Sequence, residues 1–180
     1  MNKRKKVVLG VTGSIAAYKS ADIVSQLINQ GLEVLVVMTK EAQAFITPLT
    51  LSVLSGNKTY TDMFETPQVW DVEHVSLADQ ADLILIAPAT ANVIAKLTMG
   101  LCDDVLTCIV AATKAPVVVA PAMNNNMYEH KITQANIAGL KKLGYKFVGP
   151  KLGRLACGKQ AMGCLADVGD LVEAVKRYIA

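Results

Sequence analysis

Four short runs of apolar, mostly β-branched residues constrain the fold of this 180-residue chain more than any other feature. A run without polar alternation fits a strand that is covered on both faces, as in a parallel sheet. Two weaker candidates accompany them, residues 145–148 as a fifth strand and residues 58–61 as an edge strand. The four main runs are residues 6–10, 33–38, 83–87 and 117–120.

Helical patterns fill the intervals between these runs. Ser14 is expected to cap a helix that ends before Gly31, because glycine suits the position after a helix C-terminus. Thr47 followed by Pro48 predicts a second helix start, with Gly56 at its end. Further helices are expected at residues 92–99, 104–112, 132–143 and 170–179.

This strand and helix alternation predicts an α/β fold with a doubly wound, mostly parallel sheet flanked by helices. Neither a linker nor an internal repeat divides the sequence, so residues 1–180 are expected to form a single domain. The composition, 52% hydrophobic and 18% charged, supplies enough apolar material for a large core.

Charge and segment length exclude several classes of partner. The formal net charge is +3 and the basic residues form no stripe, which argues against nucleic-acid binding. Lys3–Lys6 precedes an apolar run, but Gly10, Thr12 and Gly13 interrupt it too early for a secretory signal. No segment approaches the roughly 20 apolar residues that cross a bilayer. A cytoplasmic location away from the membrane is therefore expected.

The cysteines predict free thiols and no metal. With no export signal, the cytoplasm keeps such thiols reduced. They form no C-x-x-C array, and the interval between the last two suits no standard zinc site. The four are Cys102, Cys108, Cys157 and Cys164.

Two turns that follow predicted strands could bind an anion. Residues 10–15 place glycines at a helix start, where backbone N–H groups face outward, although they do not match the dinucleotide pattern. Residues 87–92 combine small side chains with Thr90 and Asn92 as hydrogen-bonding groups. A plain tight turn and a helix cap are the alternatives. Two such turns at one sheet edge favour a phosphate-bearing ligand, since ligands of doubly wound sheets lie beyond the strand ends.

Three further features could carry chemistry. Asn124, Asn125 and Asn126 follow a predicted strand and could hold a carboxylate or amide, or could form only a polar loop. Cys157 lies in the glycine-rich residues 153–167, which suggests a mobile lid that carries an acid or nucleophile; an idle thiol is equally consistent. His74, in the first turn of a short predicted helix, is either structural or a proton-transfer group.

These segments, in this order, resemble the homo-oligomeric flavin-containing cysteine decarboxylases along essentially the whole chain. Residues 13–19 resemble the opening loop of that family, and residues 88–92 its second flavin-contacting segment. Residues 121–127 match its P-x-M-N-x-x-M motif, followed about thirty residues later by Leu155-Ala156-Cys157-Gly158. His74 falls where the family has its active-site histidine.

The resemblance implies a Rossmann-like flavoprotein fold, FMN as the cofactor, and decarboxylation of a cysteine-derived substrate after flavin oxidises it. Asn124 would bind the substrate carboxylate, His74 would support the oxidation, and Cys157 would donate a proton. The implied FMN contacts are Gly13, Ser14, Ile15, Thr39, Thr90, Ala91, Asn92, Val93 and Ala122.

The first expected substrate is 4′-phosphopantothenoylcysteine, which would yield 4′-phosphopantetheine for coenzyme A biosynthesis. A peptide ending in cysteine is the alternative, and a flavin prenyltransferase or a non-catalytic regulatory flavoprotein ranks lower. The family also implies a homo-oligomer, a trimer or a dodecamer of trimers, with the flavin at a subunit interface. The ligase often fused to such a module would be a separate polypeptide, unless the sequence is an excised domain.

The sequence departs from the family pattern at three positions. Ala161 replaces a glycine of the lid, Cys164 stands where an arginine is often found, and Tyr128 stands where tryptophan is frequent. A stiffer lid is therefore expected, without the arginine contact. These changes affect the expected substrate preference more than the flavin site.

Overall fold

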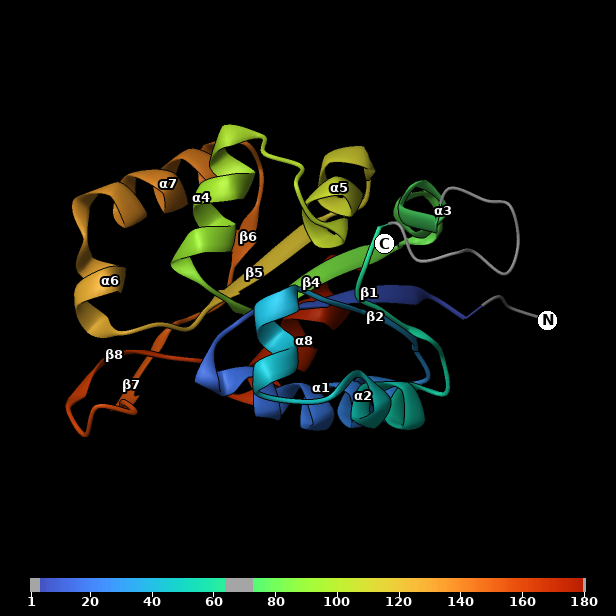
Figure 1. The fold of residues 1–180 in the computed structure, drawn as a ribbon, viewed down its shortest axis with the longest axis horizontal. Coiled ribbons are helices and arrows are strands. Elements are labelled where there is room, and N and C mark those ends of the chain that lie inside the picture. Colours follow the sequence, from blue (N-terminus) through green and yellow to red (C-terminus); the bar gives the residue numbers. More distant parts are fainter. Residues whose placement is uncertain (1–3, 64–72, 180) are drawn as a thin grey trace.

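The computed structural model describes residues 4–63 and 73–179, so Lys3 of the basic run lies outside the described part. Its centre is a six-stranded sheet in the order β3-β2-β1-β4-β5-β6, in which every neighbouring pair is parallel (Figure 1). This order reverses direction between β1 and β4, as in a doubly wound fold. The strands are β1 (Lys6–Val11), β2 (Glu33–Met38), β3 (Thr59–Tyr60), β4 (Leu83–Ala89), β5 (Val117–Pro121) and β6 (Lys146–Phe147).

Helices cover both faces of the sheet, which is why its strands are apolar at successive positions. Along β1, Val7 and Leu9 pack on one face and Val8 on the other. All seven residues of β4 are buried. The predicted α/β class, the parallel sheet and all six strands are thus confirmed.

The helices on one face are α1, α2 and α8, and those on the other are α3, α4, α5 and α7 (Figure 1). None of the helices among the described residues is long and apolar enough to span a membrane. Their bounds are α1 (Ser20–Asn29), α2 (Pro48–Ser55), α3 (Glu73–Gln80), α4 (Ala91–Met99), α5 (Val105–Ala112), α6 (Asn125–Glu129), α7 (Lys131–Lys142) and α8 (Val168–Tyr178), with two 3₁₀ helices, η1 (Ile15–Lys19) and η2 (Lys40–Ala44).

The prediction that Ser14 caps the first α-helix is wrong in one respect. Ser14 caps η1, where its hydroxyl accepts from the Ala16 N–H at 3.4 Å, and α1 begins only at Ser20. Ala16 and Ala17 are buried, and at the boundary between η1 and α1 the Ser20 hydroxyl donates to the Ala17 carbonyl at 2.6 Å. A turn at residues 12–14 and the 3₁₀ helix η1 therefore lie between β1 and α1.

Residues 153–167, in which a mobile lid is expected, contain regular secondary structure. They contain most of an antiparallel hairpin made of β7 (Lys151–Arg154) and β8 (Gln160–Cys164), separate from the main sheet. Ala161, the residue that departs from the family pattern, pairs with Gly153 across this hairpin. Cys157 thus lies at the tip of a hairpin.

Candidate active site

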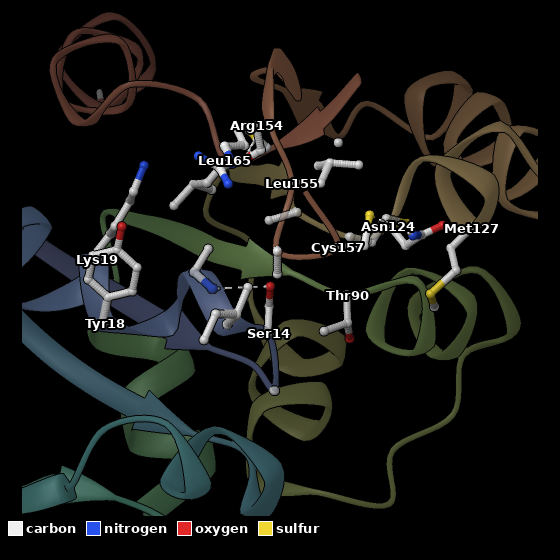
Figure 2. A pocket seen from close by; sticks show the side chains of 18 residues that line it. Ser14, Tyr18, Lys19, Thr90, Asn124, Met127, Arg154, Leu155, Cys157 and Leu165 are labelled. Atoms are coloured by element: carbon white, nitrogen blue, oxygen red, sulfur yellow. Dashed lines mark hydrogen bonds between the residues drawn. The ribbon is translucent and has the colours of Figure 1, made fainter. Parts of the chain in front are cut away.

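A cavity of about 680 Å³ opens at the carboxyl ends of β1, β4 and β5, beside the point where the strand order reverses. Ligands of doubly wound proteins bind at this position, and the volume is typical of a small-molecule pocket. Four segments contribute its walls (Figure 2). They are the β1–η1 turn with η1, the β4–α4 turn at Thr90, the β5–α6 turn with α6, and the β7–β8 hairpin.

The buried hydroxyl of Thr12 joins the first two of these segments. It donates to the Pro88 carbonyl at 2.7 Å and accepts from the Thr90 N–H at 3.1 Å. Buried polar groups need such partners, because an unpaired one costs about 1–3 kcal/mol. Thr12 therefore fixes the distance between the turn after β1 and the turn after β4.

Both turns place hydroxyl groups and helix starts at the cavity. Ser14 and Thr90 line it, and each caps the helix that follows. The Thr90 hydroxyl accepts from the Val93 N–H at 3.3 Å, so the helix-cap reading of Thr90 is correct while its side chain still borders the cavity. Gly13 is required by close packing, since a Cβ there would run into the side chain of Glu41.

Asn124 and Cys157 come together from distant parts of the sequence. Asn124 caps the N-terminus of α6, and its Oδ1 accepts from the Asn126 N–H at 2.9 Å. Its Nδ2 lies 4.0 Å from Cys157 Sγ, within the longer reach of hydrogen bonds to sulfur. Figure 2 shows both side chains at one end of the cavity with Met127, while Tyr18 and Lys19 lie at the opposite end.

A backbone contact anchors the hairpin to the β5–α6 turn. The Met123 N–H donates to the Gly163 carbonyl at 3.0 Å. Gly163 has φ +145°, and a Cβ on it would collide with the Met123 carbonyl oxygen. Only glycine fits this close approach, so Gly163 sets the position of the hairpin relative to Asn124.

The charged side chains at the cavity are basic. Lys19 and Arg154 line it, and no aspartate or glutamate among the described residues does. Next to them, a hydrogen bond from Lys151 holds the pKa of Asp167 below its ordinary value, and the charge of Lys19 acts in the same direction. The cavity therefore favours an anionic ligand.

The structure brings together residues from all four predicted segments. Asn124 and Cys157, the predicted carboxylate-binding and proton-donating residues, line the cavity. So do five of the residues expected to contact FMN, namely Gly13, Ser14, Ile15, Thr90 and Ala122.

The other predicted residues lie outside the walls of this cavity. Thr39 is buried after β2, and its Oγ1 has no hydrogen-bond partner. Ala91 and Asn92 are in the first turn of α4, and Val93 packs in the core. His74 is half-buried on α3, which lies on the opposite side of the molecule from β7 and β8 (Figure 1).

Sequence reasoning did not single out several residues of the cavity wall. Tyr18, Lys19 and Met127 were inside the matched motifs but had no assigned role. Arg154 was missed although it directly precedes the Leu155-Ala156-Cys157 segment. Position 164 lacks the family's arginine, yet β7 supplies an arginine to the cavity.

The strand order and the cavity at its reversal place the chain among the doubly wound α/β proteins that bind a ligand at the strand ends. Within this class the chain belongs to the Flavoprotein family, whose model matches residues 1–180. The probable phosphopantothenoylcysteine decarboxylase of Streptococcus mutans is 46% identical over 177 residues, covering 97% of this chain and 99% of that protein.

Three further comparisons extend this result. The coenzyme A biosynthesis bifunctional protein CoaBC of Bacillus subtilis is 43% identical over 180 residues, which are all of this chain but 44% of that protein. A solved PPC decarboxylase mutant in complex with pantothenoylaminoethenethiol has a TM-score of 0.88 and 32% identity, with 98% of each chain covered. The FMN binding protein AtHal3 has a TM-score of 0.85 at 32% identity, covering 98% of this chain and 97% of that chain.

Proposed function

We propose that this chain is an FMN-dependent decarboxylase that converts 4′-phosphopantothenoylcysteine to 4′-phosphopantetheine in coenzyme A biosynthesis. The observation that carries the proposal is the pairing of the Asn124 amide with the Cys157 thiol beside two phosphate-competent turns. The 46% identity to the Streptococcus mutans protein, over nearly its full length, supports the same reaction.

The residues present fit FMN. Gly13, Ser14 and Thr90 would hold it at the two helix starts, where N–H groups and hydroxyls suit a phosphate or a ring carbonyl. The unpartnered Oγ1 of Thr39 supports this fit, because buried hydroxyls are normally hydrogen-bonded and a ligand atom at the end of β2 would complete it. When bound, FMN supplies the reversible two-electron oxidation of the cysteine moiety that makes loss of CO₂ feasible.

Asn124 would bind and orient the substrate carboxylate. Its Oδ1 is committed to the Asn126 N–H, which leaves the donor Nδ2 to face the cavity. A donor in that position suits a carboxylate, which only accepts hydrogen bonds. The capping bond thus decides which end of the amide meets the substrate.

Cys157 would be the proton source for the product. Its side chain is exposed at the hairpin tip and borders the cavity beside Asn124. The group that holds the carboxylate and the group that supplies the proton would therefore act on the same end of the substrate. This arrangement is suited to placing a proton at a carbon that has just lost CO₂.

His74 would reach a site through a neighbouring copy of the chain. It lies on α3, outside the cavity of its own chain, so a role in the oxidation requires a second subunit. Exposed apolar side chains on and before α2, among them Phe45, Leu49 and Val53, give the chain surface to bury in such contacts. We therefore propose a homo-oligomer, a trimer or an assembly of trimers. We also propose that it is located in the cytoplasm and acts on a small molecule.

Incubation of the purified, FMN-loaded protein with 4′-phosphopantothenoylcysteine tests the function, with CO₂ and 4′-phosphopantetheine as the measured products. We expect both to form in equal amounts without an added reductant. A peptide ending in cysteine is the control substrate. Turnover of the peptide alone would assign the chain to peptide maturation, and no turnover of either substrate would refute the proposal.

A further inference from the structure

Thr12 is a fully buried residue that contacts both turns of the proposed flavin site, although it does not itself line the cavity. Its hydroxyl donates to the Pro88 carbonyl at 2.7 Å and accepts from the Thr90 N–H at 3.1 Å. Its backbone carbonyl accepts from the Ser14 N–H at 2.8 Å. One residue therefore holds the backbone of Ser14 after β1 and the backbone of Thr90 after β4.

The sheet itself does not hold these two turns together. The pairing of β1 with β4 runs from Val7 opposite Leu83 to Gly10 opposite Ile86, so it ends before either turn begins. Beyond that point, the hydroxyl of Thr12 joins the two segments through its side-chain hydrogen bonds.

The same contacts decide which hydrogens Ser14 and Thr90 can offer to a ligand. Both backbone N–H groups are committed to Thr12. Each side-chain oxygen accepts from the helix that follows it, Ser14 from the Ala16 N–H and Thr90 from the Val93 N–H. In the part of the chain that the structure describes, neither hydroxyl donates to a protein acceptor. Each keeps its hydrogen for a ligand acceptor, such as a phosphate or ring carbonyl oxygen of FMN.

The place of Thr12 requires a group that donates and accepts at the same time. The Pro88 carbonyl, in a strand whose residues are all buried, needs a donor, and the Thr90 N–H needs an acceptor. A hydroxyl meets both needs, whereas valine, which has nearly the same shape, meets neither. Without the hydroxyl, the two turns are no longer held at one distance.

We propose that Thr12 is a positioning residue for FMN, which sets the relative position of the two turns and acts only through Ser14 and Thr90. The inference rests on the proposed function, which places FMN against these turns. A ligand that contacts both turns binds more tightly when they are held in place beforehand, because less freedom is lost on binding. Loss of an outer-shell partner weakens metal sites by about 10- to 100-fold, and we expect a similar effect on FMN.

Release of FMN from the loaded protein tests this role, followed after dilution as the gain in fluorescence of free flavin. Thr12→Val should release FMN about 10- to 100-fold faster than wild type, since affinity changes of this kind act mostly on dissociation. Thr12→Ser keeps the hydroxyl and should release FMN at close to the wild-type rate. The visible circular dichroism of the bound flavin should change in Thr12→Val and not in Thr12→Ser.

Thr113→Val is the matched control. The Thr113 hydroxyl also donates to a backbone carbonyl, that of Ala78, and accepts from a backbone N–H, that of Ala115, both at 3.0 Å. It lies between α5 and β5 and does not line the cavity. Thr113→Val should therefore lower the denaturant concentration at the midpoint of unfolding and leave FMN release unchanged.

Thr12→Cys keeps the test decisive if Thr12→Val does not fold. A thiol is a weak donor and a weak acceptor, so this variant should release FMN faster than Thr12→Ser. Far-ultraviolet circular dichroism establishes that each variant compared is folded.

Three results would overturn the proposal. One is equal FMN release from folded Thr12→Val and Thr113→Val. Another is release from Thr12→Ser as fast as from Thr12→Val, and the third is equal release from Thr12→Ser and Thr12→Cys. None of these measurements requires turnover. A wild-type protein that retains FMN without decarboxylating 4′-phosphopantothenoylcysteine would refute the proposed function, while the release rates still decide the role of Thr12.

Discussion

The Asn124 amide points toward the Cys157 thiol, with 4.0 Å between Nδ2 and Sγ, although 33 residues separate them in the chain. Their relative position depends on the backbone contact between Met123 and Gly163, which joins the β5–α6 turn to the hairpin. Different elements thus carry the two groups, and one backbone hydrogen bond sets their relative position. Changes in the side chains and changes in the anchor can therefore be tested separately.

Cys157→Ser should reduce decarboxylation by about 10²- to 10⁴-fold, the usual contribution of a positioned acid, because a serine hydroxyl is a much weaker acid than a thiol. FMN content should not change, since Cys157 is on the hairpin and the proposed flavin turns are elsewhere. Single-turnover measurements and the flavin absorption spectrum check the two parts. The matched control is Cys164→Ser, and an equal loss in that variant would contradict a specific role for Cys157.

Two substitutions of Asn124 separate its helix-capping role from its proposed binding role. Asn124→Asp keeps an oxygen that caps α6, so the free energy of unfolding should stay close to wild type. The same variant loses the Nδ2 donor and places a negative charge against a carboxylate, so turnover should be lost. Asn124→Ala should lose turnover and also about 1 kcal/mol of stability. Denaturant unfolding and turnover, measured on both variants, give the comparison.

Gly163→Ala should destabilise the protein by about 1–3 kcal/mol, because the backbone is at φ +145° and the added methyl group meets the Met123 carbonyl. The hairpin should shift relative to Asn124, which raises KM. Gly169→Ala in α8 is the control, since nothing lies within 4 Å of the added Cβ and alanine favours a helix. If both variants unfold at the same denaturant concentration, the anchor is not a determinant of stability.

Arg154→Ala should raise KM for 4′-phosphopantothenoylcysteine by about 10- to 100-fold, because a hydrogen bond to a charged group contributes about 1.5–3 kcal/mol. Lys159→Ala, which removes a charge from the hairpin tip outside the cavity, should have little effect. Steady-state kinetics are measured with 4′-phosphopantothenoylcysteine and with the same compound without its phosphate. A KM effect on the phosphorylated substrate alone would show that Arg154 contacts the phosphate. An unchanged KM for both substrates, or a loss of FMN in place of a KM effect, would contradict a substrate contact.

Mixing two inactive variants tests whether sites are shared between subunits. His74→Asn and Cys157→Ser should each be inactive as homo-oligomers. Co-expressed in equal amounts, they should recover about a quarter of wild-type activity, because random assembly places both intact residues at about one site in four. Light scattering gives the assembly size, and no recovery in a verified mixed oligomer would place His74 outside a shared site.

The four central strands were predictable because both faces of the sheet are covered there, so their sequences are almost continuously apolar, as in β4. The turns that carry Ser14, Thr90 and Asn124 were predictable because each follows such a strand. The β7–β8 hairpin was not, since its strands are short, largely exposed and outside the main core. The location of Arg154 at the cavity depends on the register of that hairpin, which no apolar periodicity specifies.

The role of Ser14 was misjudged for a different reason. A cap residue indicates that a helix starts, but it does not tell a 3₁₀ turn from an α-helix. Ala16 and Ala17, which lie within η1, are buried in the core. This burial is a tertiary effect that the local sequence does not contain.

The Thr12 hydroxyl has a consequence for the kinetics of folding. Its two partners lie 76 and 78 residues further along the chain, so the hydrogen bonds can form only after β1 and β4 have paired. Closing so long a loop comes late on the folding route. The proposed flavin turns are therefore complete only once the central sheet exists. A cofactor that recognises both turns should slow unfolding and leave the rate of folding almost unchanged.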